Sequence, residues 1–168
     1  MSAGELQSAT LSSPIGKLYL LTRGETVLAL NLSGFKDLLS TLSDDELSEK
    51  IGKSGKNHIV VDKLERYFDG ELSVINSIKV KQPGGEFSQA AWACMRKIKV
   101  GTTESYSDLA YRAGSPAAVR AAGSACAKNK VAVIIPCHRI VKAGGAIGAY
   151  GWGVDKKVWL LRHEGALD

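Results

Sequence analysis

The chain has 168 residues, of which 45% are hydrophobic and 23% charged, with 18 glycines and four prolines. This composition is typical of one ordinary folded domain or two small ones, and it excludes a disordered, low-complexity or repeat protein. The formal net charge of +5 is uneven, because residues 1–84 carry ten Lys and Arg against eleven Asp and Glu, whereas residues 85–168 carry twelve against six. A basic half favours an anionic partner such as nucleic acid, although a solvated basic surface explains it equally well.

The N-terminal sequence and the cysteines indicate the compartment. Residues 1–16 have neither a basic n-region nor an apolar h-region, and no apolar run approaches the roughly 18 residues of a membrane span. We therefore expect a cytoplasmic protein with no membrane partner. The three cysteines, Cys94, Cys126 and Cys137, are odd in number and have no repeated spacing, so we expect reduced thiols rather than a disulfide framework or a paired-cysteine zinc site.

The first half of the chain is predicted to form a small antiparallel sheet and helices. Residues 13–23 and 25–32, separated by a glycine break, have the alternation of an antiparallel strand pair. Ser33 is expected to cap a helix that extends to Leu42, and residues 61–71 predict a second helix, followed by a strand over 73–81. No catalytic residue types cluster here, and His58 is interpreted as a surface histidine.

The segment KQPGGE, residues 81–86, breaks regular structure and is the natural domain boundary. We expect an N-terminal α/β domain over 1–80, a linker over 81–86 and a second domain over 87–168. After the linker, apolar residues at helical spacing predict a helix; they are Phe87, Ala91, Cys94, Met95 and Ile98. On that face Cys94 is interpreted as a buried structural thiol.

Two short helices joined by a turn are predicted between residues 103 and 129. Ser105 and Asp108 stand in the capping-box relation, which starts the first helix, and Gly114 can end it. Ser115 and Pro116 then suit the N-cap and the first turn of a second helix. Such a pair is typical of a helix-turn-helix, although the pattern also arises by chance.

The second of these helices has small side chains where a helix that recognises a base sequence has long ones. Arg120 is its one long charged side chain before Lys128, and its small residues are Ala117, Ala118, Ala121, Ala122, Gly123, Ser124 and Ala125. This surface lets the backbone approach DNA closely but offers few groups to base edges. Two interpretations have equal weight at this point: non-specific docking on DNA, with Arg120 entering the base stack or pairing with phosphate, and packing against a neighbouring helix.

The run VAVIIPCHRIV, residues 131–141, predicts a buried strand that ends in a thiol, an imidazole and a guanidinium. A cysteine nucleophile acts as a thiolate, and His138 and Arg139 could bring the pKa of Cys137 below its free value of about 8.5. Successive side chains of an extended segment point to opposite faces, so a water or a local turn must mediate any contact between Cys137 and His138. Glu164 is a candidate carboxylate to orient His138. An ordinary buried cysteine is the alternative.

The chain resembles the O6-alkylguanine-DNA alkyltransferases. The similarity is densest in TTESYSDLAYRAGSP, IPCHRIV and GAYGWGVDKKVWLLRHEG, extends more loosely to LERYFDGE, and covers about residues 60–165. The order PCHR then HEG, with a helix-turn-helix upstream, is highly specific for that family. The resemblance implies an α/β N-terminal domain of ribonuclease-H-like topology, with a small antiparallel sheet plus helices, followed by a mostly α winged helix-turn-helix domain.

The resemblance implies DNA repair by direct, stoichiometric transfer of an alkyl group, mainly methyl, from O6 of guanine, and from O4 of thymine, after base flipping. It implies that Cys137 is the acceptor, that His138 is its base through a water, and that Glu164 orients His138. Tyr106 would donate a proton to the guanine ring. An O6-alkyl group lies inside the stacked duplex, so flipping the base out is a physical requirement of this chemistry.

The resemblance also implies a DNA-contacting surface and a pocket. Arg120 would fill the vacated base stack, and the other DNA-contacting residues would be Ser105, Pro116, Ala121, Gly123 and Ser124. Asn129 would brace the turn before the acceptor, and the rest of the pocket and its support would be Arg139, Ile140, Tyr150, Gly151 and Trp152. We expect double-stranded DNA as a sequence-independent partner bound through its minor groove, a monomer associated with the nucleoid, or with the nucleus of a eukaryote, and neither a cofactor nor a metal.

The chain departs from the family pattern at two positions that bear on the pocket. Trp152 stands where many members have glycine, and Ala132 stands where some have proline. These residues predict a narrower pocket that favours methyl over bulky adducts. The N-terminal half has no cysteine and only one histidine, His58, so the structural zinc of some relatives is not expected.

Two other functions compete with repair. An alkyltransferase-like sensor would bind lesions without transfer, but those relatives replace the nucleophile, and Cys137 is present. A helix-turn-helix regulator with an incidental cysteine would need side chains that recognise bases, which the alanine-rich helix lacks. Cys126, on that helix, is either a small packing residue or an exposed thiol near the DNA.

Overall fold

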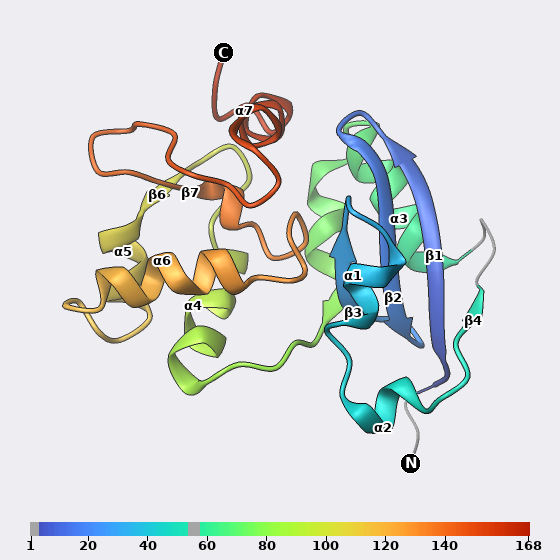
Figure 1. Cartoon of the computed structure of the whole chain (residues 1–168). Helices are drawn as coiled ribbons and strands as arrows, with labels where there is room; N and C mark the ends of the chain where they lie inside the picture. Colours follow the sequence, from blue (N-terminus) through green and yellow to red (C-terminus); the bar gives the residue numbers. More distant parts are fainter. Residues whose placement is uncertain (1–3, 54–57) are drawn as a thin grey trace. The chain divides into compact units, whose positions relative to one another are not determined.

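The computed structural model describes residues 4–53 and 58–168, and the chain divides into two compact units, residues 1–82 and 83–168 (Figure 1). The division falls inside the Pro/Gly segment 81–86. In the described part of the chain, none of the helices combines the length and the apolar character needed to cross a bilayer.

A five-stranded sheet in the order β4-β1-β2-β3-β5 forms the first unit. Its centre is an antiparallel meander of β1 (Leu6–Ser13), β2 (Gly16–Arg23) and β3 (Thr26–Asn31), and the two-residue strands β4 (Gly52–Lys53) and β5 (Lys79–Val80) pair in parallel at its edges. The antiparallel pair predicted on either side of the glycine break is confirmed as β2 and β3. Strand β1 was not predicted, because its polar residues obscure the alternation.

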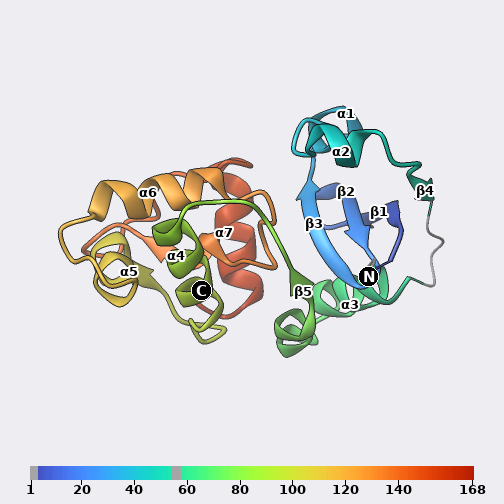
Figure 2. The ribbon, with the colours of Figure 1, turned by 90° about the horizontal axis from the view of Figure 1, so that it is seen from below.

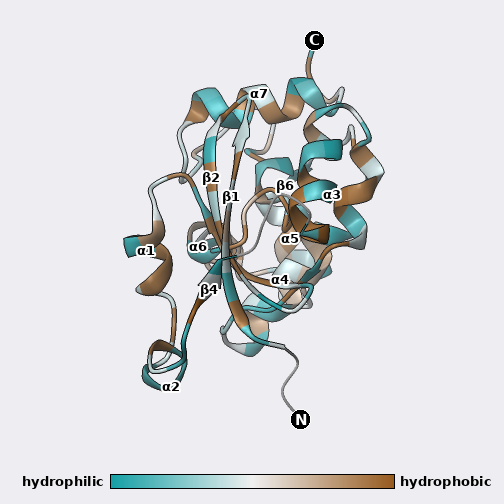
Figure 3. Ribbon diagram, turned by 90° about the vertical axis from the view of Figure 1, so that its right-hand side faces the viewer, coloured by the Kyte–Doolittle hydropathy of each residue, from teal (hydrophilic) through white to brown (hydrophobic). Residues whose placement is uncertain are grey.

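Helices lie on both sides of this sheet. Figure 2 shows α1 (Phe35–Leu39) and α2 (Asp44–Leu47) on one side and α3 (Ile59–Phe68) on the other. Hydrophobic and hydrophilic residues are interspersed along α1 and α3 (Figure 3), as expected of helices with one buried face. The core under α1 combines one residue from each of β2, β3 and α1, namely Leu21, Ala29 and Leu38.

Two predictions in this unit are wrong. The N-cap of α1 is Gly34, with a φ of 124°, rather than Ser33, because the side chain of Asn31 bonds both the amide and the carbonyl of Gly34 and closes a turn there. The strand predicted over 73–81 is mainly a 3-10 helix, η1 (Leu72–Ser77), and only β5 is extended. Alternating apolar residues in so short a segment also suit a 3-10 helix that buries Val74 and Ile75.

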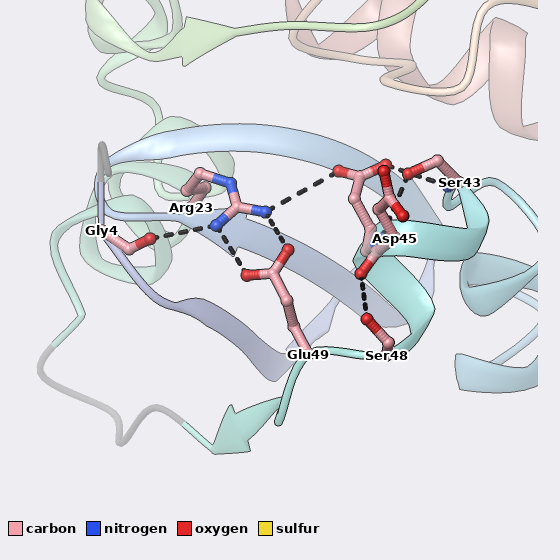
Figure 4. Close-up of polar contacts among 7 residues, drawn as sticks. Gly4, Arg23, Ser43, Asp45, Ser48 and Glu49 are labelled. Carbon is pink, nitrogen blue, oxygen red and sulfur yellow. Dashed lines mark hydrogen bonds and ion pairs between the residues drawn. The ribbon is translucent and has the colours of Figure 1, made fainter. Parts of the chain in front are cut away.

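Polar contacts at the end of β2 hold the N-terminal segment near α2 (Figure 4). The guanidinium of Arg23 donates to both carboxylate oxygens of Glu49, at 3.0 and 2.8 Å, and to the carbonyl of Gly4 at 3.1 Å. Helix α2 begins with a capping box formed by Ser43 and Glu46. These contacts connect segments that are far apart in the sequence.

His58 is a structural residue of this unit. It is half-buried at the N-cap of α3, where its Nδ1 accepts from the amide of Val60 at 3.1 Å. Because Nδ1 accepts, Nε2 carries the proton and donates to the carbonyl of Gly24 at 3.2 Å. The histidine therefore links the start of α3 to the turn between β2 and β3.

The second unit is mostly helical. Its helices are α4 (Glu86–Arg96), α5 (Tyr106–Arg112), α6 (Val119–Lys128) and α7 (Val154–His163), and its only regular sheet among the described residues is the parallel pair β6 (Glu104–Ser105) and β7 (Ile140–Val141). Helices α4, α5 and α6 pack against one another (Figures 1 and 2). The face predicted for α4 buries Ala91, Met95 and Ile98, but Cys94 is half-buried rather than buried.

The helix pair α5–α6 begins as predicted and then differs. Ser105 and Asp108 form the expected capping box. Gly114, with a φ of 95°, ends α5 in a Schellman motif, in which the amide of Ser115 donates to the carbonyl of Ala110 at 3.0 Å. Ser115 thus belongs to the end of α5, and α6 begins only at Val119 after a turn, so Ser115 and Pro116 are not its N-cap and first turn.

Candidate active site in the second unit

The apolar run before Cys137 is a tight buried turn, not the predicted strand. The amide of Ile135 donates to the carbonyl of Val131 at 2.9 Å. Val133 has a φ of 71° and is the one described non-glycine residue at positive φ, a conformation that β-branched residues rarely adopt. A short apolar run has no periodicity that distinguishes a strand from another buried segment, which explains the wrong prediction.

Asn129 holds this turn from the end of α6. Its side-chain Nδ2 donates to the carbonyl of Ile135 at 2.8 Å, and its Oδ1 accepts from the amide of Val131 at 3.1 Å. The two bonds connect the first and last parts of the turn, so Cys137 follows at a fixed place. The bracing expected of Asn129 is thus present in the geometry.

Cys137, His138 and Arg139 form a 3-10 helix, η2, and all three are buried. A 3-10 helix has three residues per turn, so adjacent side chains point about 120° apart. The thiol and the imidazole therefore still point in different directions, as they would on a strand.

His138, Arg139 and Glu164 form a buried network. Nε2 of His138 lies 3.0 Å from Oε2 of Glu164. Arg139 donates through Nε to Oε1 of Glu164 at 2.9 Å, through Nη2 to Oε2 at 3.0 Å, and through Nη1 to the carbonyl of Ile98 at 2.8 Å. Glu164 was proposed from the sequence as a partner of His138; Arg139, which was not expected there, contacts the same carboxylate.

This network determines which nitrogen of His138 is basic. Burial alone would raise the pKa of Glu164, but its contacts with His138 and Arg139 outweigh burial and hold that pKa well below the usual carboxyl range. Burial lowers the pKa of His138, although Glu164 opposes the shift. A neutral imidazole that donates from Nε2 to a carboxylate has its lone pair on Nδ1. Neither ring nitrogen makes a hydrogen bond of good geometry among the described residues, but Nε2 has the Glu164 carboxylate 3.0 Å away, so Nδ1 is the nitrogen left without a partner.

Cys137 is only 7% exposed, and burial raises the pKa of its thiol. A hydrogen bond with Asn129 and the charge of Lys157 act in the opposite direction. The resting residue is therefore a thiol rather than a thiolate, and its reaction needs a base. Cys126, on α6, is half-buried, and burial raises its pKa to about 12, which favours the packing interpretation of that residue.

Lys157 is a site residue that the sequence analysis missed. It is fully buried in α7, where its Nζ donates to the carbonyl of Ile140 at 2.6 Å and to that of Ala149 at 3.2 Å, and burial lowers its pKa. It lies seven residues before Glu164, which is two turns along the same helical face. A lysine at helical spacing from Leu160 and Glu164 lies on the buried face of the helix, and this spacing could have indicated its position from the sequence.

Tyr106 reaches the site through the pairing of β6 with β7. Ser105 pairs with Val141, so Tyr106 begins α5 beside the segment that follows η2. A Cβ placed on Gly148 would lie 3.4 Å from the Tyr106 hydroxyl and 3.6 Å from Nζ of Lys157. Burial raises the pKa of Tyr106, so its hydroxyl keeps its proton.

Aromatic rings continue the site on one side. The rings of His138 and Tyr150 are 6.5 Å apart, and those of Tyr150 and Trp152 are 6.0 Å apart, both edge to face. Of the other residues expected at the pocket, Ile140 is fully buried, whereas Gly151 is exposed.

Helix α6 uses its small residues in two ways. Ala122 and Ala125 are fully buried in the unit, as the packing interpretation requires. Arg120 and Ser124 are exposed, and Ala121 and Gly123 are half-buried. These four residues are therefore accessible to a binding partner. Of the other predicted contacts, Pro116 is exposed and Ser105 is half-buried. In the described part of the chain, His, Cys, Asp and Glu form no group that could hold a metal ion.

Comparisons with known proteins show which proteins this chain is similar to. The family model for the DNA-binding domain of 6-O-methylguanine DNA methyltransferase matches residues 86–166. The methylated-DNA–protein-cysteine methyltransferase of Salmonella typhimurium is 32% identical over 162 residues, with 94% of each chain covered. The bifunctional transcriptional activator and DNA repair enzyme Ada of Escherichia coli is 52% identical over 81 residues, which are 48% of this chain and 23% of Ada.

Solved structures show the same similarity over both units. The crystal structure of O6-methylguanine methyltransferase from Mycobacterium tuberculosis has a TM-score of 0.76 and 31% identity, covering 96% of this chain and 93% of that one. The complex of the M. tuberculosis protein with DNA gives a TM-score of 0.78 over 95% and 93%. A small mixed sheet with helices, followed by a helical unit with a buried thiol, is thus the two-domain alkyltransferase fold. The chain belongs to the methylated-DNA–protein-cysteine methyltransferase family.

Proposed function

We propose that this protein repairs DNA by moving an alkyl group, mainly methyl, from O6 of guanine to Sγ of Cys137. The observation that carries the proposal is a buried thiol whose next two residues form a network with one carboxylate, Glu164, in a chain of this family. The activity is that of a methylated-DNA–protein-cysteine S-methyltransferase. Each molecule acts once, because the thioether that forms has no route back to the thiol.

His138 serves as the base for Cys137 through a water. Its buried Nδ1 carries the lone pair and has no partner among the described residues, and a buried polar atom of this kind is normally satisfied. A water between Nδ1 and Sγ satisfies it and also bridges two side chains that point apart. The proton leaves Sγ through this water to Nδ1, and the carboxylate of Glu164 stabilises the imidazolium that results.

The transfer itself is an in-line displacement at the alkyl carbon. The bond from sulfur to carbon forms while the bond from carbon to O6 breaks, and the electron pair of that bond stays on guanine. Tyr106 supplies the proton that neutralises the guanine ring; because burial raises its pKa, the hydroxyl is still protonated when the reaction begins. The same chemistry extends to O4 of thymine.

Arg120 and the small residues of α6 bind the DNA. An exposed Arg120 at the start of α6 fills the space of the flipped nucleotide, and the half-buried Ala121 and Gly123 let the backbone approach the minor groove. Few side chains of α6 can contact base edges, so binding is independent of sequence and depends on phosphate contacts and salt. The protein acts as a monomer wherever the cell keeps its DNA.

The finer topology of the two units belongs to the same proposal. The meander β1–β2–β3 with α3 on one face supports a ribonuclease-H-like first domain. The pair α5–α6 with the β6–β7 pairing supports a winged helix-turn-helix second domain. Residues 81–86 are then the linker between them.

The test is the mass of the intact protein after incubation with duplex DNA that contains O6-methylguanine. One added methyl, mapped to Cys137 and absent in Cys137→Ala, is the expected result. Cys94→Ala is the matched control and gains the methyl as the wild type does. If the protein binds the DNA without gaining mass, the proposed transfer is wrong and the lesion-sensor alternative is supported.

A further inference from the structure

Trp92 connects α4 to the last turn of the DNA-facing helix. It is 3% exposed, and its indole Nε1 donates to the carbonyl of Ala125 at 2.9 Å. Ala125 is itself fully buried on α6. A buried bond between residues 33 positions apart fixes how these two helices lie against each other.

This bond lies where α6 stops being an α-helix. The amide of Asn129 donates to the carbonyl of Cys126 at 3.3 Å, three residues back, which is a 3-10 step. An α-helical step would use the carbonyl of Ala125, the group that receives the indole N–H. The 3-10 step at the end of α6 leaves the carbonyl of Ala125 without an intrahelical donor, and the indole of Trp92 supplies one. The next residue after the helix, Asn129, has an extended backbone, with φ −65° and ψ 113°.

The conformation of Asn129 then determines where the acceptor turn lies. Its side chain accepts from the amide of Val131 and donates to the carbonyl of Ile135, two residues before Cys137, and it lowers the pKa of the Cys137 thiol. Contacts thus run without a gap from Trp92 through Ala125 and Asn129 to Cys137. The first step is a hydrogen bond from α4 to α6, the second is the last turn of α6, and the third is the pair of hydrogen bonds from Asn129 to the turn that leads to Cys137.

The segment before α4 keeps the indole in place. A Cβ added to Gly84 would lie 2.6 and 2.7 Å from Cη2 and Cζ3 of Trp92. Only a residue without a side chain fits there, so the backbone at Gly84 packs directly on the ring. Gly85, the next residue, has nothing within 4 Å of an added Cβ.

We propose that Trp92 is a positioning residue for the acceptor: its indole N–H sets the end of α6, and with it the Asn129 side chain that holds the Cys137 turn. The inference rests on the proposed role of Cys137 as the acceptor. It adds that helix α6, which meets the DNA, and the turn that carries the thiol are held in one arrangement by a residue of α4 that contacts α6 at Ala125.

The first test is Trp92→Phe, which keeps an aromatic ring but loses the donor. The reaction of Cys137 with iodoacetamide, followed by peptide mass mapping across pH, needs no DNA. Because Asn129 lowers the pKa of Cys137, we expect the pH midpoint of the reaction to rise in Trp92→Phe, so that less thiolate reacts at neutral pH. Trp159→Phe, a tryptophan substitution on α7, should leave the midpoint where it is in the wild type.

The direction of the shift separates positioning from loosened packing. A loosened core would expose the thiol, remove the effect of burial that raises its pKa, and move the midpoint down. A double-mutant cycle adds a second criterion: Asn129→Ala should give the same upward shift, and Trp92→Phe should add little to it. A midpoint that is unchanged or lower in Trp92→Phe, or full additivity in the cycle, overturns the proposal.

Gly84→Ala tests the same contact without altering Trp92. The added methyl displaces the indole, so the midpoint should rise as in Trp92→Phe, whereas Gly85→Ala should leave it unchanged. Equal midpoints for the two alanine variants would contradict the proposal even if Trp92→Phe failed to fold. If the wild type gains no methyl from DNA, the proposed function fails, but the iodoacetamide profiles still decide the role of Trp92.

Discussion

Glu164→Gln is the most informative single change in the buried network. The substitution keeps the size of the side chain and removes the charge that faces Arg139 and His138. In the wild type one carboxylate lies 2.9 and 3.0 Å from two nitrogens of Arg139 and 3.0 Å from Nε2 of His138. An amide has one oxygen to accept these bonds, and its NH2 group must face at least one N–H donor.

The expected loss is large because the charge left behind is buried. Arg139 is fully buried, and removing one partner of a buried ion pair costs about 3–5 kcal/mol. For a protein of this size, that loss lowers Tm by about 6–20 °C. The protein should still fold at room temperature, since total stabilities are about 5–15 kcal/mol.

The assay is urea unfolding at pH 7, followed by circular dichroism, with methyl transfer measured on the folded protein at 20 °C. Transfer should fall by at least about tenfold, because His138 is no longer oriented as a base. The exposed Glu65→Gln, on α3, is the control and should stay within about 0.5 kcal/mol of the wild type. A Glu164→Gln protein within 1 kcal/mol of the wild type would refute the view that the ionised carboxylate neutralises Arg139.

Three further changes test the DNA surface and the pocket. Arg120→Ala should slow transfer from duplex DNA much more than transfer from the free methylated base, and equal losses would reject its role in flipping. Gly123→Ala meets nothing within 4 Å, so it should add about 1 kcal/mol of stability while weakening DNA binding in a gel-shift assay; unchanged affinity would mean that this part of α6 does not meet DNA. Trp152→Gly should speed labelling by a benzylguanine probe and leave transfer from methylated DNA near the wild-type rate, whereas a wild type that reacts equally fast with both would exclude a narrow pocket.

The sequence predicted those parts of the fold that depend on local patterns. The capping box at Ser105, the strand pair β2–β3 and the buried face of α4 follow from alternation, helical spacing or a cap, each of which spans a few residues. The start of α6 did not follow, because Ser115 is used by the Schellman end of the preceding helix. Ser115 cannot both end α5 and cap α6, and the sequence does not show which of the two roles it has.

The site was predictable in its members but not in its conformation. The sequence itself named Cys137, His138 and Glu164 as candidates and the resemblance implied their roles; in the structure Nε2 of His138 lies 3.0 Å from Oε2 of Glu164. The positive φ of Val133 could not be predicted from the sequence, because no residue in the apolar run indicates a strained turn. Lys157 and Trp92 were missed because their role depends on carbonyls that other segments leave over, and a backbone carbonyl has no sequence signature.

The pairing of β6 with β7 closes a loop around the functional part of the second unit. Glu104 and Ser105 pair with Ile140 and Val141, so everything from Tyr106 to Arg139 begins and ends at the same two rungs. Tyr106, helix α6 and Cys137, to which we assign proton donation, DNA binding and alkyl acceptance, therefore lie in one segment with adjacent ends. A segment with adjacent ends could be exchanged between relatives as one piece. Glu164, which contacts this segment, and Lys157, which donates to Ile140 directly after it, lie outside the segment.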